Sequence, residues 1–587
     1  MAGKINYDAI PGNTHLVDKD GHMAARHSAG QKEIVLIPTP SEDPDDPLNW
    51  TRNRKWWSMF CMVVYTYGVG VPSAAIYSVL TNIAEETDIT LSQLNAGTGY
   101  MFLFFGLGCL IFQPLALQYG KRPIYLISTL ATALICVWAP HTKSNGEWIG
   151  SKILQGFFGA PIESLCEISV TDIFFEHERA RGMGIYAVAL LTSNFVAPLV
   201  AGFITNGIGW EWVMYLCAIW GAVAFVFLFF FMEETNYTRV IHPQKLLEEL
   251  EGVDPISPIK SKSPNDDEKK LGTVLSNQTI EERLADVNEA FESASSGNVS
   301  YTEKSTKTWI QKMSLTSGAQ KRFLLPHFLL GPFKMAMFPS VLWAGFLYGS
   351  SLVWFNLLNA TEATILGGAP YNFSPSMCGL AYISPTIFSV VFYFFAGYLS
   401  DWLKIRIAKS RPDGLSYPED RLWVLLIYCF LGFLASIGWG VGAYYEVHWM
   451  CLVVSMGVLG GLGVFGAIGG VTYCSDCYHE LDTEGMVVVI MIRNLMSFAC
   501  SYGLTDWVLN MGYKNAFISS ACILFFCNFT FLLMRLTGPY WRNKTKVFTK
   551  FADAADGLPV GLTLIGRRYT EESALKASKV VADALAA

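Results

Sequence analysis

Charged residues are scarce in this sequence. Asp, Glu, Lys and Arg together make up 16% of the 587 residues, whereas hydrophobic residues make up 52%. Soluble domains usually contain about 25% charged residues, so this balance excludes an ordinary soluble protein and indicates a lipid bilayer as the main surroundings. The net charge of −7 says little about partners, and we expect no nucleic acid among them.

We expect neither a cleavable leader peptide nor a disulfide framework. The first 50 residues are polar and proline-containing, without the apolar core of a cleavable signal peptide. All 13 cysteines lie between Cys61 and Cys527, so the polar tails have none to pair. Cys474 and Cys477 form one CxxC pair without a second pair, and we therefore expect no metal and no cofactor.

Long apolar runs are what the sequence does contain. About twelve runs of roughly twenty residues match the length that a helix needs to cross about 30 Å of hydrocarbon. They cover residues 57–78, 95–117, 124–140, 148–172, 184–206, 212–232, 337–358, 377–399, 422–443, 448–472, 486–508 and 514–534. The sequence therefore predicts an all-α membrane protein with twelve transmembrane helices.

Basic residues concentrate in alternate loops. The clusters are Arg52, Arg54 and Lys55; Lys121 and Arg122; Arg179 and Arg181; Lys404, Arg406, Lys409 and Arg411; and Arg535, Arg542, Lys544 and Lys546. The other loops contain almost none, with Lys143 and Lys514 as exceptions. Positively charged loops stay on the cytoplasmic side, so both termini are expected there. Asn359 then lies on the outer side and could accept a glycan.

The spans divide into two halves. We expect a largely disordered cytoplasmic tail at residues 1–55 and a six-helix half at 56–232. A polar cytoplasmic linker at 233–336, a second six-helix half at 337–535 and a cytoplasmic tail at 536–587 follow. The fourth span ends near Asp172 and the tenth near Asp476, in similar surroundings of His-Glu and Gly-Met pairs. Such parallel repeats are typical of carriers that work by alternating access.

The fourth span carries charges in an apolar setting. At about 100° per residue, Glu163 lies about 20° and Glu167 about 60° around the helix from Lys152. Each such charge costs roughly 2.5–3.5 kcal/mol to insert, so a polar stripe of this kind indicates a pathway for protons or a cation. The alternative is that Glu163 and Glu167 form a buried salt bridge with Lys152 or Arg493 that only fixes helix register.

Several motifs identify a family resemblance. The loop 114–123 contains Gly120, Lys121 and Arg122, and a matching loop of the second half contains Asp401. These loops resemble the gating motif of the major facilitator superfamily, in particular the fungal twelve-span drug:proton antiporter group. The resemblance implies the major facilitator fold and assigns a gating role to the four residues named above. Asp172 and Asp476, at neighbouring span ends, are assigned the same role. The first loop has Leu117 where the family has Asp, which should weaken one lock.

Spans four and five extend this resemblance. Lys152 and Gln155 resemble the family's proton-relay motif, with Lys in place of the usual Arg. Span five has the spacing of the antiporter motif, whose small residues and proline permit close packing and a bend, at Gly184, Ser193, Ala197, Pro198 and Gly202. The run 36–50 resembles a fungal subgroup of histidinol and polyamine permeases.

The last forty residues do not fit this plan. The segments 556–562 and 565–568 resemble the C-terminus of amidase-signature hydrolases. Those enzymes use a Ser–Ser–Lys set in a Gly/Ser-rich core, which the chain lacks, so we do not expect an enzyme. The tail is interpreted as a fusion remnant or a read-through of the gene model.

The expected function is secondary active transport. The expected substrate is a small organic solute, cationic or xenobiotic, moved with protons and in the direction of efflux, by a monomer in the plasma membrane. Relay and substrate contacts are assigned to Lys152, Gln155, Glu163, Glu167 and Arg493. Two alternatives stay open: a proton-driven uptake permease for polyamines or other nutrients, and a nutrient receptor that does not transport.

Overall fold

Helices dominate the computed structural model. It describes residues 14–15, 27–28, 31–35, 43, 45–87, 89–237, 311, 313–314, 323, 325–411, 415–478 and 482–554. The chain divides into two units, residues 1–239 with 308–569 and residues 240–307 with 570–587. All described residues belong to the first unit. The predicted linker is therefore mostly outside the described residues, as is the amidase-like segment from 556 onward.

The first group of helices covers residues 47–231. Its α-helices are α1 Arg52–Ala74, α2 Leu80–Glu86, α3 Leu91–Tyr119, α4 Lys121–Trp138, α5 Asn145–Gly159, α6 Pro161–Ile173, α7 Glu176–Ile208 and α8 Glu211–Phe231. Short 3₁₀ turns η2 Pro47–Asn49, η3 Tyr77–Val79 and η4 Ala139–His141 flank them. Capping boxes begin α3 and α5, where Thr90 and Ser144 each accept from a backbone N–H three residues later.

The second group covers residues 325–554. It comprises α12 Leu325–Met335, α13 Pro339–Gly367, α14 Pro375–Ala381, α15 Ile383–Ser410, η5 Pro418–Val424, α16 Leu425–Tyr444, α17 Trp449–Ala467, the π-helical turn η6 Ile468–Thr472, α18 Tyr473–Cys477, α19 Asp482–Phe529 and α20 Phe531–Ala554. The strands form two antiparallel pairs, β1 Thr14–His15 with β4 Leu415–Ser416 and β2 His27–Ser28 with β3 Gln31–Val35.

The helical class is confirmed, but the count differs from the prediction. Ten helical stretches of the described chain are long and apolar enough to cross a membrane. One of them, Glu484–Thr545, is 62 residues long and contains both predicted spans 486–508 and 514–534, which meet at the non-helical Gly512 (φ 73°). The predicted span 148–172 is absent from the ten because it is divided into α5 and α6, of 15 and 13 residues.

The prediction of one continuous helix over 148–172 is wrong. Pro161 has no N–H to donate to the carbonyl oxygen of Phe157, and the N–H of Ala160 donates to it instead at 3.4 Å. The backbone at Ala160 stays in the right-handed helical region (φ −49°, ψ −38°), so the chain continues in the same sense after the break. The angular estimate for Lys152 and Glu163 assumed an unbroken helix and does not hold across this break.

The ordered chain also begins earlier and ends later than the predicted halves. Leu48 and Trp50 are 2% and 6% exposed, so the last part of the predicted N-terminal tail packs in the core. Asp43 accepts from the hydroxyl of Tyr237 at 3.0 Å, which ties this segment to the chain after α8. At the other end, α20 continues to Ala554, past the predicted limit at 535.

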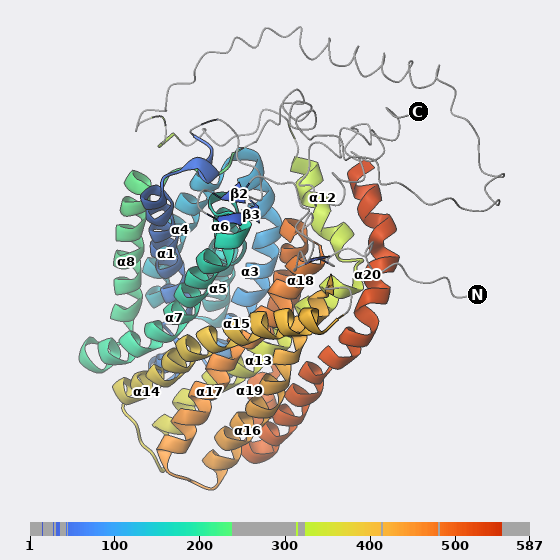
Figure 1. The fold of residues 1–587 in the computed structure, drawn as a ribbon. Helices are drawn as coiled ribbons and strands as arrows, with labels where there is room; N and C mark the ends of the chain where they lie inside the picture. The colour runs from blue at the N-terminus through green and yellow to red at the C-terminus, as the bar shows by residue number, and fades with distance from the viewer. Residues whose placement is uncertain are drawn as a thin grey trace, which may run out of the picture. The chain divides into compact units, whose positions relative to one another are not determined.

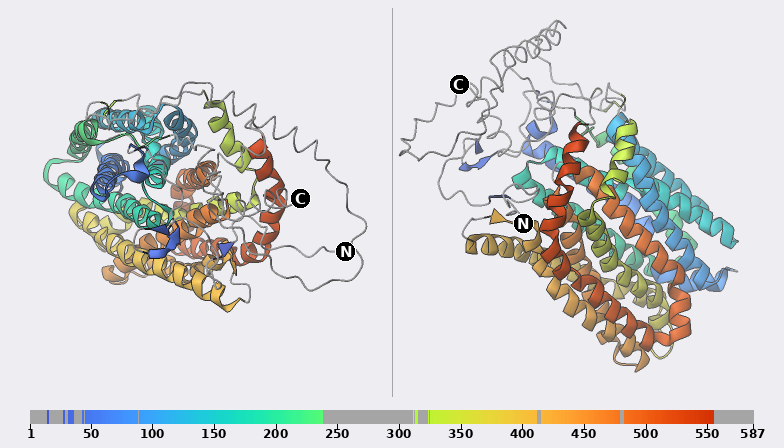
Figure 2. Two further views of the ribbon diagram at one scale, coloured as in Figure 1. Left: turned by 45° about the horizontal axis from the view of Figure 1, so that its top comes forward. Right: turned by 90° about the vertical axis from the view of Figure 1, so that its right-hand side faces the viewer.

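Two groups of helices pack against each other. In Figure 1 and Figure 2 the blue-to-green helices gather on one side and the yellow-to-red helices on the other. Within the groups, α1 packs on α7 and α8, α3 on α5, α13 on α19, and α15 on α17. Between the groups, α3 packs on α19, and α7 on α14 and α15. The outward faces remain apolar, with Phe394 and Phe526 both 70% exposed, as lipid contact requires.

Glycines make several of these contacts possible. A methyl group at Gly156 of α5 would clash with the carbonyl oxygen of Met101 in α3. Gly146 lies in the same helix and has nothing within 4 Å of such a methyl group. Gly156 therefore has no room for a methyl group, whereas Gly146 in the same helix does.

We expect Gly156→Ala to lower the stability of the protein by about 1–3 kcal/mol, because the methyl group must push α5 away from α3. Gly146→Ala should leave stability unchanged or raise it slightly, since alanine restricts the unfolded chain. Thermal unfolding of the purified protein in detergent, followed by fluorescence-detected size exclusion, measures both. Equal melting temperatures for the two variants would contradict the contact.

Candidate functional site

Glu163 joins the two groups of helices. It lies in the first turn of α6, and its carboxylate forms an ion pair with the guanidinium of Arg493 in α19. The amide of Asn494 donates to its other oxygen at 2.6 Å. Arg493 in turn donates to the side-chain oxygen of Asn494 at 3.0 Å. Glu163, Arg493 and Asn494 are all buried. These three residues are called the bridge cluster below.

Tyrosines hold the bridge cluster from both sides. Arg493 donates to the hydroxyl of Tyr348 in α13 at 3.2 Å and lies 5.1 Å from the centre of its ring. The hydroxyl of Tyr186 in α7 donates to the carbonyl of Ile162 at 2.6 Å, which fixes α6 beside the ion pair. Glu167 is half-buried one turn further along α6 and interacts electrostatically with Tyr186 and Tyr348.

Lys152 lies in separate surroundings. Its ammonium donates to the side-chain oxygen of Gln155 at 2.8 Å, and Gln155 donates to the carbonyl of Pro72 in α1 at 3.0 Å. The ammonium also lies 4.7 Å from the centre of the Trp148 ring. The predicted stripe is thus divided: Lys152 and Gln155 stay within the first group of helices, whereas Glu163 contacts the second. Of the two proposed salt-bridge partners of Glu163, the structure shows Arg493.

The bridge cluster can respond to charge. Removing one partner of a buried ion pair costs about 3–5 kcal/mol, because the other charge is left unpaired. The guanidinium stays charged at any accessible pH, so protonation of the carboxylate is the change that can break the pair. A cationic solute that competes with Arg493 for Glu163 would have the same effect.

The predicted gating residues of the first half form one cluster at the turn between α3 and α4. Gly120 has φ 112°, a conformation that favours glycine. Lys121 forms an ion pair with Asp172 at the end of α6. The backbone N–H groups of Lys121 and Arg122 each donate to Glu234 at 3.0 Å, and Arg122 also donates to the carbonyl of Phe229 at 2.6 Å.

A corresponding ion pair is present in the second half. Lys404 in α15 lies 3.1 Å from Asp476 in α18, as Lys121 pairs with Asp172 in the first half. The similar ends of the fourth and tenth spans predicted that Asp172 and Asp476 occupy corresponding positions, but not that each pairs with a lysine. Asp401 lies in α15, and its side chain is outside the described part of the structure.

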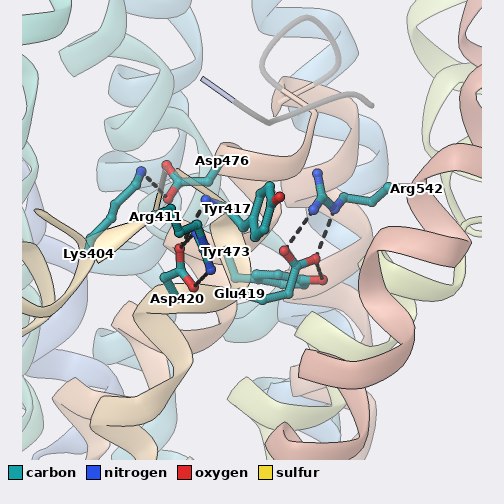
Figure 3. A network of polar contacts seen from close by, with 8 residues as sticks. All are labelled: Lys404, Arg411, Tyr417, Glu419, Asp420, Tyr473, Asp476 and Arg542. Carbon is teal, nitrogen blue, oxygen red and sulfur yellow. Dashed lines mark hydrogen bonds and ion pairs between the residues drawn. The ribbon is translucent and has the colours of Figure 1, made fainter. Parts of the chain in front are cut away.

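Figure 3 shows further ion pairs around Asp476 that sequence reasoning missed. Arg542 of α20 donates to Glu419 of η5 at 2.9 and 2.7 Å, and both side chains are almost fully buried. Arg411 pairs with Asp420 at 2.5 Å. The acidic pair Glu419-Asp420 directly before an apolar run could have indicated these ion pairs. In the sequence, Arg542 indicated only the cytoplasmic side of the membrane.

The small residues predicted in span five all lie in α7. Gly184 and Gly202 are contact points: an added methyl group would clash with the hydroxyl of Tyr393 in α15 and with the carbonyl of Pro375 in α14. Ser193 donates to the carbonyl of Leu190, Ala197 is buried, and α7 continues through Pro198. Gly184 and Gly202 therefore allow α7 to approach the second group of helices closely, whereas Ser193 faces Gly70 of α1 in the first group.

The structure contradicts the prediction that Asn359 accepts a glycan. Asn359 lies within α13, is 4% exposed and accepts from the hydroxyl of Tyr382 at 3.3 Å. A buried, hydrogen-bonded amide in a helix is not accessible to a glycosyl transferase. The prediction assumed that the span ended at residue 358, whereas α13 continues to Gly367.

No disulfide joins the cysteines of the described residues. Cys474 and Cys477 of the CxxC motif are buried in α18. Within the described ranges, His, Cys, Asp and Glu side chains form no group of three that could hold a metal ion.

Comparison with known proteins agrees with this arrangement. Residues 58–496 match the family described as the Major Facilitator Superfamily. An uncharacterised MFS-type transporter of Schizosaccharomyces pombe is 27% identical over 92% of this chain and 93% of its own. Protein HOL1 of Saccharomyces cerevisiae is 24% identical over 88% of this chain and 91% of its own.

More distant relatives share the same plan. MFS antiporter QDR3 of Candida albicans is 19% identical over 89% of this chain and 82% of its own. Among solved structures, the xylose transporter XylE from E. coli matches with a TM-score of 0.50 and 12% identity, over 81% of this chain and 97% of that one. At this identity the structural match concerns the fold alone.

The buried pair of Glu419 and Arg542 should matter for stability. We expect Glu419→Gln to destabilise the protein by about 3–5 kcal/mol, because Arg542 is left buried without a counter-charge. Glu85→Gln, at an exposed position of α2, is the matched control and should have little effect. Thermal unfolding in detergent compares them, and similar melting temperatures would show that the pair contributes little.

Proposed function

Since the chain belongs to the Major Facilitator Superfamily, we propose that it is a proton-coupled secondary transporter that moves small organic cations across a membrane by alternating access. The observation that carries this proposal is the bridge cluster, in which a buried carboxylate of one group of helices pairs with a buried guanidinium of the other. A titratable contact between two moving parts is what proton coupling requires.

Protonation of Glu163 would release the two groups from each other. A neutral carboxylic acid no longer attracts Arg493, so the contact between α6 and α19 weakens and the helices can separate. Deprotonation restores the pair. A bound organic cation can replace Arg493 as the partner of Glu163, which would link the protonation state to substrate binding. Glu167 and Tyr348 lie close enough to line the same region.

The driving force is sufficient for accumulation. A charge that crosses a potential of 100 mV releases about 2.3 kcal/mol. A proton that moves down a gradient of one pH unit releases about 1.4 kcal/mol. Efflux of a singly charged cation in exchange for one proton moves no net charge, so the pH term alone drives it and supports a concentration ratio of about tenfold per pH unit. The potential contributes only when net positive charge moves inward, as in uptake of the cation together with a proton.

The proposed topology has twelve spans in two halves with both termini in the cytoplasm, and the proposed location is the plasma membrane. The division of α5 from α6 and the bend at Gly512 are compatible with twelve crossings. In this topology the pairs Lys121–Asp172 and Lys404–Asp476 lie at the cytoplasmic ends of their halves. There these ion pairs would hold the cytoplasmic ends of the helices together and keep the cytoplasmic entrance closed.

The proposed direction is efflux. The printed name of one relative, MFS antiporter QDR3, supports exchange of solute against protons. The alternative is proton-driven uptake of polyamines or other nutrients, which the resemblance of residues 36–50 to fungal permeases favours. In the described part of that segment Asp46 caps η2 and Trp50 is buried, contacts that are compatible with either direction.

Charge neutralisation tests the proton coupling. We expect Glu163→Gln to reduce proton-driven flux by at least about tenfold, because the bridge can no longer be made and broken by a proton. Glu167→Gln should change the pH dependence of flux, since this carboxyl interacts with the same tyrosines. Glu147→Gln, at an exposed capping position of α5, is the matched control. Flux unchanged by both Glu163→Gln and Glu167→Gln would exclude the assignment.

Flux measurements also distinguish efflux from uptake, and a transporter from a receptor that does not transport. Radiolabelled polyamine and a toxic organic cation, supplied to yeast that lacks its own transporters, should leave the cells faster when the protein is present and the proton gradient is intact. Accumulation instead of loss would establish uptake. Signalling without flux of any tested solute, unaffected by Glu163→Gln, would identify the receptor alternative.

A further inference from the structure

A second buried carboxyl group lies far from the bridge cluster. Glu362 is in α13, about five residues before its end at Gly367, and is 0% exposed. Neither of its carboxyl oxygens has a hydrogen-bond partner of nitrogen or oxygen among the described residues. The predicted span 337–358 ended before this residue, so sequence reasoning placed Glu362 in an outer loop and gave it no role.

The neighbours of Glu362 are neutral groups. The thiol of Cys378 in α14 lies against the carboxyl group, and a thiol is only a weak donor. Tyr382, at the junction of α14 and α15, interacts electrostatically with Glu362, Cys378 and Tyr77 of η3. Among the described residues, Cys378 and Tyr382 are the titratable groups that act on the carboxyl, and no basic side chain acts on it.

Glu362 lies on the same face of α13 as Phe355, whose ring packs against the first group of helices. Counting about 100° per residue, Tyr348, Phe355, Asn359 and Glu362 lie within about 60° of one another on the helix. Tyr348 contacts Arg493 of the bridge cluster, and the ring of Phe355 lies 5.1 Å from that of Phe195 in α7. Glu362 is about 21 Å further along this face than Tyr348, where α13 packs against η3.

Its surroundings favour the neutral acid. An ionised carboxylate without a partner in an apolar interior costs many kcal/mol, and the neighbouring thiol and tyrosines offer no counter-charge. The closed contact between η3, α13 and α14 is therefore compatible with Glu362 only when the group carries a proton. Separation of these elements would admit water and allow the carboxyl to ionise.

We propose that Glu362 is a second proton-binding site of the transport cycle, which holds a proton while the two groups of helices are closed around it and releases that proton to water when they separate. In the proposed topology this end of α13 faces the outside of the cell, so the proton exchanges with the external solution. The inference rests on the proposed alternating access but concerns a different residue and a different side of the protein.

A native cysteine reports on the opening. Cys378 is 3% exposed and lies beside Glu362, so a membrane-impermeant maleimide reaches it only when the contact opens. Full-length protein in lipid vesicles is labelled at external pH values of about 6 and about 8, and modification of Cys378 is quantified by peptide mass spectrometry. Labelling of Cys451, an exposed cysteine at the start of α17, corrects for the pH dependence of thiol chemistry.

The wild-type protein should be compared with Glu362→Gln, which resembles the protonated acid. We expect equal Cys378 labelling of the two proteins near pH 6. Near pH 8 the wild type should be labelled about fivefold more or better, because ionisation of Glu362 favours the open state. Glu362→Asp keeps a titratable group and should retain the pH dependence. If the ratio of Cys378 labelling in the wild type to that in Glu362→Gln were near one at both pH values, the proposal would be overturned.

Two further outcomes separate this inference from the proposed function. If Glu362→Gln does not fold, the wild type alone is decisive: its Cys378 labelling relative to Cys451 must rise with pH, and a constant ratio overturns the inference. Glu163→Gln should abolish flux and leave the Cys378 response intact. A pH-dependent Cys378 response without any solute flux would contradict the proposed transport while supporting proton binding at Glu362.

Discussion

The structure depends on one electrostatic constraint, namely that a charge placed in an apolar interior must have a partner. Glu163 and Arg493 lie in different groups of helices, and each is buried. Neither charge could be buried alone without a cost of several kcal/mol, so the ion pair holds α6 and α19 together. Asn494 and Tyr348 satisfy the remaining polar atoms, which makes the contact both stable and sensitive to the protonation of one carboxyl group.

The same constraint shapes the ends of the helices. Lys121 with Asp172 and Lys404 with Asp476 repeat one pairing in the two halves, and Glu419 with Arg542 adds a more deeply buried pair. These charges are paired within their own half, whereas the bridge cluster pairs charges between halves. Rigid halves with a titratable contact between them are well suited to rocking as units.

Glycine supplies the complementary steric condition. Helices of the two groups approach closely where side chains are smallest, as at Gly202 against Pro375 and at Gly106, where a methyl group would lie 3.2 Å from Asn494. The antiporter-like spacing in α7 thus has a structural explanation that is independent of the direction of transport. Small residues allow the two groups of helices to meet closely.

The sequence alone determined the helical class and showed that Glu163 lies within an apolar run, since apolar runs and the charges within them are local features of the chain. It could not reveal that Pro161 divides the fourth span, because Pro72, Pro114 and Pro198 lie inside helices that continue past them. It also left open which cation pairs with Glu163, and it placed Asn359 and Glu362 in a loop. Only the tertiary structure decided these points, because residues 330 positions apart become neighbours through packing that no periodicity encodes.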